Sequence, residues 1–161
     1  MKKTAQPIGM QGLTLIELLV VIAVIGILAA VVMASLNSAR VKARDVRRIA
    51  DMKNIYTALQ LYYDQYGYLP MTNVYGEVNT GGWDYSSQGN FLSFLVTAGF
   101  FSSVPKDPVN NGIGDVFYSG SGYSYGYYCY LPNHSVSLGT RLERTNAVYW
   151  IASEVADFTC Q

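Results

Sequence analysis

The stretch "QGLTLIELLVVIAVIGILAAVV", residues 11–32, decides the fold because it is long and apolar enough to form a membrane-spanning helix. Between Leu13 and Val32 the only polar residues are Thr14 and Glu17. A helix of this length measures about 30 Å at ~1.5 Å per residue, which matches the hydrocarbon thickness of a bilayer. Glu17 needs an explanation, since a charge in the hydrocarbon is costly unless it is neutralised.

Two other interpretations of this stretch remain open. A cleaved secretory signal peptide has a shorter apolar core, of about 7 to 15 residues. A plain anchor with a cytoplasmic head is favoured by the basic segment that follows, because six Lys/Arg stand against two Asp between Arg40 and Lys53. The lysines at positions 2 and 3 favour the opposite orientation, with the N-terminus in the cytoplasm. Charge alone therefore leaves the topology open.

The rest of the composition indicates one small exported domain. About 95 residues follow Gln65, enough for a modest globular head. Eleven Lys/Arg balance eleven Asp/Glu over the whole chain, but from Asp64 onwards three basic residues face eight acidic ones. This balance gives no support for a nucleic-acid partner. Cys129 and Cys160 suggest one disulfide if the domain is exported, and two separate thiols if it is cytosolic.

The helix is expected to continue to Tyr66, because no proline occurs between Leu13 and Leu69. Apolar residues at helical spacing predict a face that covers a sheet: Ile49, Met52, Tyr56, Leu59, Tyr63 and Tyr66. Four arginines are expected to project into solvent from the opposite side: Arg40, Arg44, Arg47 and Arg48. Asp45 and Asp51 lie at helical pairing distance from Arg48.

Beyond the helix, turn residues and alternating patterns predict a small antiparallel sheet. Gly67 and Pro70 end the helix, and residues 71–88 are expected to form a surface loop. A short helix is expected around Leu92 and Leu95, capped by Asn90 and closed by Gly99. Strands are predicted at 123–131, 136–142 and 147–152, with a connection at 132–134 and a possible short edge strand at 116–118. The expected fold class is α+β, with the long helix packed on three or four strands.

The segment "GLTLIELLVV", Gly12 to Val21, resembles the class III signal of type IV prepilins and of the pseudopilins of type II secretion. The resemblance implies that a prepilin peptidase cuts between Gly12 and Leu13 and methylates the new amine of Leu13. It also places Glu17 at the family's glutamate and Gly26 at a recurring glycine. The family's first mature residue is most often Phe, and many members carry a proline where this chain has Ala34.

The resemblance gives Glu17 a chemical role. A cut before Leu13 creates an α-amine, and a carboxylate four residues on can compensate its charge in low dielectric. Glu17 is thus expected to be an assembly residue that pairs with its own amine or a neighbour's. The alternative is a tolerated carboxylate that reaches the headgroups from the end of the apolar run.

The resemblance also implies the pilin fold and its division of the chain. Residues 1–12 are the expected leader, 13–66 the long helix with 13–33 as its transmembrane and assembly segment, 67–115 a loop with a short helix, and 116–161 the sheet and a disulfide-closed C-terminal region. In many pilins a disulfide ties the C-terminal segment to the sheet, and a Cys129–Cys160 bond matches that placement. Such a bond is worth about 3 to 4 kcal/mol on the chain-entropy model.

The function implied is that of a structural subunit of a type IV pilus-like filament. Its expected partners are the prepilin peptidase, other pilin subunits, an inner-membrane assembly platform and the lipid bilayer, with nucleic acid unfavoured. Before assembly it would cross the bacterial inner membrane once, with a cytoplasmic N-terminus, and after assembly it would lie in an extracellular or periplasmic filament. The alternatives are a type II secretion pseudopilin or a membrane-anchored extracytoplasmic binding module that never polymerises.

The sequence favours a non-enzymatic role without a cofactor. The single histidine, His134, falls in an expected turn, and phosphate-loop and nucleophile motifs are absent. Asp107 and Asp115, with Asn110 and Asn111 between them, are weak calcium candidates because major pseudopilins bind calcium in a comparable loop. Their spacing does not reproduce an EF-hand, so turn formation explains them better.

Overall fold

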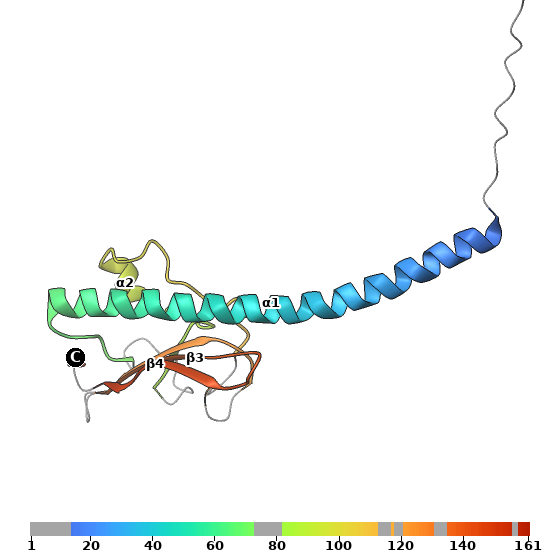
Figure 1. Ribbon diagram of the computed structural model, residues 1–161. Helices are drawn as coiled ribbons and strands as arrows, with labels where there is room; N and C mark the ends of the chain where they lie inside the picture. The colour runs from blue at the N-terminus through green and yellow to red at the C-terminus, as the bar shows by residue number, and fades with distance from the viewer. Residues whose placement is uncertain (1–13, 73–81, 113–116, 118–120, 131–134, 156–157) are drawn as a thin grey trace, which may run out of the picture. The chain divides into compact units, whose positions relative to one another are not determined.

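The computed structural model describes residues 14–72, 82–112, 117, 121–130, 135–155 and 158–161 (Figure 1). It contains a long helix α1 (Leu15–Tyr66), a short helix α2 (Ser93–Thr97) and four strands: β1 (Asp84–Tyr85), β2 (Tyr125–Tyr130), β3 (Ser135–Arg141) and β4 (Val148–Val155). The α+β fold class is therefore as predicted. The chain divides into two compact units, residues 1–39 and 40–161.

The first unit contains the N-terminal part of α1. Every side chain described between Thr14 and Ala39 is exposed, including the large apolar ones. By length and composition alone this is a helix that can cross a membrane.

The second unit contains the rest of α1 and a four-stranded antiparallel sheet in the order β1-β2-β3-β4. Strands β2 and β3 pair from Tyr125 opposite Thr140 to Tyr130 opposite Ser135. The β3–β4 ladder has irregular register around Leu138. The β2–β3 hairpin thus follows the period-two pattern of the sequence throughout, whereas the β3–β4 ladder departs from it around Leu138.

One face of the sheet packs with α1 around the main core (Figure 1). The helix contributes Met52, Ile55, Leu59 and Tyr62, all at most 7% exposed. The sheet contributes alternate residues of β2 and β3, among them Tyr125, Tyr127, Cys129, Val136 and Leu138. Residues 91–95 close this core with Phe91, Leu92 and Leu95.

A second cluster is mostly aromatic. Its members on β2 and β4 alternate along the strand with residues that pack in the main core. Its buried members are Trp83, Tyr85 and Phe117, with Tyr128, Val148 and Trp150 packed against them. Gly126 and Gly139 face each other across β2 and β3. A methyl group at either glycine would collide with an aromatic ring, that of Phe117 or that of Trp150. The glycines therefore make room for this cluster.

Several expectations for the helix and loops were wrong. Arg48 is buried and Arg44 is partly buried, whereas Arg40 and Arg47 are exposed as predicted. Tyr66 does not reach the core and is 43% exposed. The reason is that the buried face of α1 runs through positions 48, 52, 55, 59 and 62, which is rotated from the predicted stripe.

The segment expected to be a surface loop contains β1, which pairs with β2 through Asp84 opposite Tyr127. The predicted cap of α2 was also wrong. Asn90 makes no side-chain capping bond; Leu92 occupies the N-cap with φ 47°, and its N–H donates to the Asp84 carboxylate (2.9 Å). Apart from Phe117, the expected edge strand at 116–118 lies outside the described residues, as does the connection at 132–134.

Candidate processing and assembly site

Thr14 and Glu17 form a capping box at the start of α1. The Thr14 N–H and the Thr14 hydroxyl both donate to Glu17 Oε2, each at 2.8 Å, and the Glu17 N–H donates to Thr14 Oγ1 at 3.3 Å. These bonds satisfy backbone donors that have no partner in the first helical turn. The Glu17 carboxylate is therefore held at Thr14, the residue directly before the helix.

The capping role of Thr14 was not recognised from the sequence, although a signal for it was present. A Thr followed three residues later by Glu, directly before an apolar run, is the pattern of a capping box. Gly12 and Leu13, the residues expected at the cleavage point, lie outside the described residues.

The helix that follows Glu17 presents an apolar surface with no covering in its own unit. Its exposed large residues continue from Leu18 to Leu36. Gly26 lies among them, and a Cβ built on it meets no heavy atom within 4 Å. Packing within the chain therefore gives no reason for a glycine at this position.

In the second unit, a buried cluster of charges joins α1 to two distant segments. The Arg48 guanidinium donates to Asp107 (Nε–Oδ2 2.6 Å, Nη2–Oδ1 3.0 Å) and to Asp45 (Nη1–Oδ1 2.9 Å). It also pairs with Glu143, whose Oε1 lies 2.6 Å from Arg48 Nη1. Arg44 donates its Nε to the same Glu143 carboxylate at 2.7 Å. This ion cluster consists of Arg44, Asp45, Arg48, Asp107 and Glu143.

Backbone groups complete the ion cluster. Asp45 accepts the N–H groups of Glu143 (2.8 Å) and Arg144 (3.0 Å), at the turn between β3 and β4. Asp107 accepts those of Val109 (2.8 Å) and Asn110 (3.2 Å). The helix thus organises two loops through carboxylates that arginine side chains neutralise.

The charges in the cluster stabilise one another. Burial by itself lowers the pKa of Arg48, but hydrogen bonds and attraction from Asp107, Glu143 and Asp45 raise it above its usual value. The hydrogen bond from Arg44 lowers the pKa of Glu143, with Arg48 adding to the effect. Arg48 and Glu143 therefore remain ionised at neutral pH.

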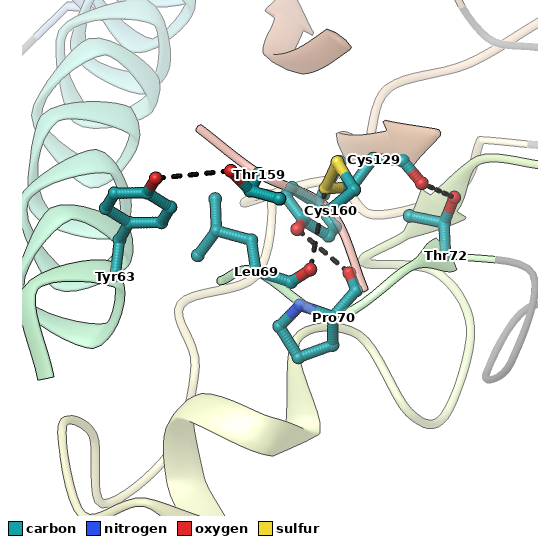
Figure 2. The surroundings of a disulfide bond; sticks show 8 residues. Tyr63, Leu69, Pro70, Thr72, Cys129, Thr159 and Cys160 are labelled. Carbon is teal, nitrogen blue, oxygen red and sulfur yellow. Dashed lines mark hydrogen bonds between the residues drawn. A yellow bond between two sulfur atoms is a disulfide. The ribbon is translucent and has the colours of Figure 1, made fainter. Parts of the chain in front are cut away.

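The C-terminal segment is joined to the head by the expected disulfide, between Cys129 of β2 and Cys160 (Figure 2). Leu69 bridges to the segment by donating its N–H to Thr159 O (2.8 Å) and accepting the Gln161 N–H (2.9 Å). Figure 2 also shows Tyr63 of α1 within hydrogen-bond distance of the Thr159 hydroxyl, at 3.4 Å. The segment is thus fixed to β2, to Leu69 three residues beyond the helix, and to the helix itself.

The calcium candidates that the structure describes already have other hydrogen-bond partners. Both Asp107 oxygens already bind Arg48, and Asp115 lies outside the described residues. The side-chain oxygen of Asn110 accepts the Ser86 hydroxyl, and that of Asn111 accepts the Tyr123 N–H. Among the described residues, no three His, Cys, Asp or Glu side chains are grouped to hold a metal ion. His134 is not described either.

Comparison with known proteins gave one match. Residues 9–33 match the family of the prokaryotic N-terminal methylation motif. This range includes the capping box and most of the exposed apolar part of α1. Neither the curated proteins nor the solved structures returned a significant match.

Proposed function

We propose, since residues 9–33 carry the class III signal of type IV prepilins and pseudopilins, that this chain is a structural subunit of a type IV pilus-like filament. In this proposal a prepilin peptidase removes residues 1–12 and methylates the amine of Leu13. The apolar part of α1 then polymerises with other subunits. The observation that carries the proposal is the match itself, which joins the signal to an exposed apolar helix.

The capping box supports pairing of Glu17 with the amine of its own chain. The Thr14 nitrogen that donates to Glu17 belongs to the peptide bond that follows Leu13. The amine that cleavage would create on Leu13 is one residue along the chain from this nitrogen, and consecutive Cα atoms are about 3.8 Å apart. A paired amine and carboxylate are less costly to keep within the bilayer than either ion alone.

Assembly then needs specific contacts. Moving an apolar helix from lipid into a helix bundle changes little in its hydrophobic environment, so close packing and polar pairing decide the register. Gly26 has no steric neighbour within its own chain and suits a close approach by another helix. Glu17 and Gly26 are thus the residues to which we assign the assembly contacts.

The ion cluster bears on the orientation in the membrane. Of the basic residues between Arg40 and Lys53, Arg44 and Arg48 are neutralised by acidic partners in the folded head. This weakens the charge argument for a cytoplasmic head. We therefore place the N-terminus in the cytoplasm and the head outside, in a bacterial inner membrane before assembly and in a filament afterwards. An inner-membrane assembly platform would drive that transfer.

Mass spectrometry of the mature N-terminus tests the proposal. A chain that begins with methylated Leu13 is expected. An intact Met1 or a terminus near Arg40 contradicts it, and indicates a plain anchor or a secreted domain instead. Electron microscopy of the cell surface then separates long pili from the short filaments of a secretion pseudopilus.

A further inference from the structure

A pocket at the C-terminal end of α1 is lined by aromatic rings and small polar groups. It has a volume of about 430 Å³. Tyr62 and Tyr66 come from the last turns of the helix, Tyr68 from the segment that follows, and Phe94 from α2. None of this pocket belongs to the N-terminal motif or to the ion cluster.

Two tyrosines of this pocket are in ring contact, and the outer one keeps part of its side chain exposed to solvent. Tyr66 lies on Tyr62 with ring centroids 4.4 Å apart and planes at 36°, while Phe94 meets Tyr62 edge-on at 5.0 Å. Tyr62 is buried, but Tyr66 is 43% exposed. The fold therefore uses Tyr62 as support and leaves a large part of the Tyr66 side chain exposed, although burial would stabilise it.

The polar lining indicates the chemistry of a ligand. Ser93 and Thr97 of α2 contribute hydroxyl groups, and no lining side chain carries a charge. Uncharged donors and acceptors beside aromatic faces suit a neutral polyhydroxylated molecule, because its C–H bonds pack on the negative ring faces and its hydroxyls form hydrogen bonds. The volume falls within the usual range for small-molecule sites, roughly 300 to 1,000 Å³.

We propose that this pocket binds a neutral pyranose sugar, with Tyr66 as the stacking platform. A second pocket, of about 440 Å³, has a different lining that includes Asp64 and the exposed Leu61. Leu61 lies on the same end of α1 and outside the proposed site, so Leu61→Ala is a matched control for Tyr66→Ala.

The test is saturation-transfer NMR on the full chain in polyoxyethylene-ether micelles, which contain neither sugar nor choline. The probes are methyl β-galactoside, methyl β-glucoside, N-acetylglucosamine and, separately, choline. Transfer to the ring protons of at least one sugar is expected. Affinity should fall about tenfold in Tyr66→Ala and remain unchanged in Leu61→Ala. Tyr66→Phe keeps the ring and should bind within about threefold of the native chain.

Thr97→Trp is the second variant, for use if Tyr66→Ala does not fold. Thr97 is exposed and lines the pocket, so the larger tryptophan ring would block it. It should abolish the sugar signal. The proposal is overturned if none of the three sugars shows transfer, if affinity is unchanged in Tyr66→Ala, if transfer survives in Thr97→Trp, or if choline alone binds. The last result would identify an aromatic site for cations.

Discussion

Arg48 and Asp107 lie 59 residues apart in the sequence and form a doubly hydrogen-bonded ion pair in which both side chains are completely buried. One partner comes from α1 and the other from the loop that precedes β2. Because a buried charge is very costly without its partner, this pair makes the position of the loop depend on the helix.

Asp107→Asn should strongly destabilise the head. The variant keeps an acceptor for the N–H groups of Val109 and Asn110 but leaves Arg48 short of one counter-charge. A loss of about 3 kcal/mol in the free energy of unfolding is expected. Urea unfolding followed by the fluorescence of Trp83 and Trp150 measures it.

The control for this experiment is the exposed pair between Arg47 and Asp51, whose atoms lie 3.5 Å apart. Arg47→Ala should cost less than about 1 kcal/mol because its side chain is 62% exposed. Equal losses in the two variants would contradict a special role for the buried pair.

Asp84 should make the head less stable as the pH rises. Burial raises the pKa of this carboxyl from 3.8 to about 6, and the hydrogen bond from Leu92 only partly opposes the shift. Its Oδ1 is buried without a hydrogen-bond partner, and Tyr127 is the titratable neighbour that feels its charge. The unfolded carboxyl ionises first, so stability falls between pH 4 and 6 and then stays lower, by at most about 3 kcal/mol.

Asp84→Asn removes that charge and keeps an oxygen for the Leu92 N–H. The variant should be more stable than the native chain at pH 7.5, and the difference should shrink as the pH is lowered to 4. Comparing the two chains isolates Asp84 from Glu143, whose lowered pKa acts on stability in the opposite direction. A difference that does not vary with pH would rule out the ionisation of Asp84 as its cause.

Gly139→Ala should disturb the aromatic cluster. A Cβ at this position would lie 2.5 Å from the Trp150 ring and 3.0 Å from the Tyr149 carbonyl. Because the Trp150 ring packs against Trp83 and Phe117, relief requires movement of β4 or of these rings, and a loss of about 1 to 3 kcal/mol is expected. Gly89→Ala is the control, since a Cβ there meets nothing within 4 Å. Near-ultraviolet circular dichroism and urea unfolding report the change.

Removal of the disulfide should loosen the C-terminal segment. The bond joins residues 31 positions apart, so Cys129→Ser/Cys160→Ser should lose about 3 kcal/mol of unfolding free energy. The native chain treated with a reducing agent should show the same loss. If reduction leaves its unfolding curve unchanged, the bond contributes little beyond the Leu69 backbone bridge.

Glu17→Gln separates charge pairing from helix capping. Glutamine preserves the capping box with Thr14 but removes the negative charge, whereas Glu17→Ala removes both. If Glu17 compensates an amine, both variants should insert in the membrane, fold their heads and fail to yield filaments in a shearing assay. Normal filaments from Glu17→Gln would show that capping alone is sufficient.

The local and periodic features of the chain were predictable. The apolar run, the helix end at Gly67 and the strands around β2, β3 and β4 follow from residue pattern and turn chemistry. The sequence predicts a loop at 84–85 because two residues carry no detectable period. Arg48 was placed in solvent because it is charged, although its spacing from Met52, Ile55 and Leu59 already put it on the buried face.

The sequence by itself determined the N-terminal motif, the length of the helix and the α+β class, because these depend on residues that are neighbours along the chain. Only the tertiary structure decided which acids neutralise Arg48, how Gly126 and Gly139 admit aromatic rings, and where Tyr66 is left exposed. Each of these depends on side chains from segments that are distant in the sequence. Arg44 and Glu143, for example, are about a hundred residues apart. Such contacts form only when packing brings distant segments together, and no local pattern specifies them.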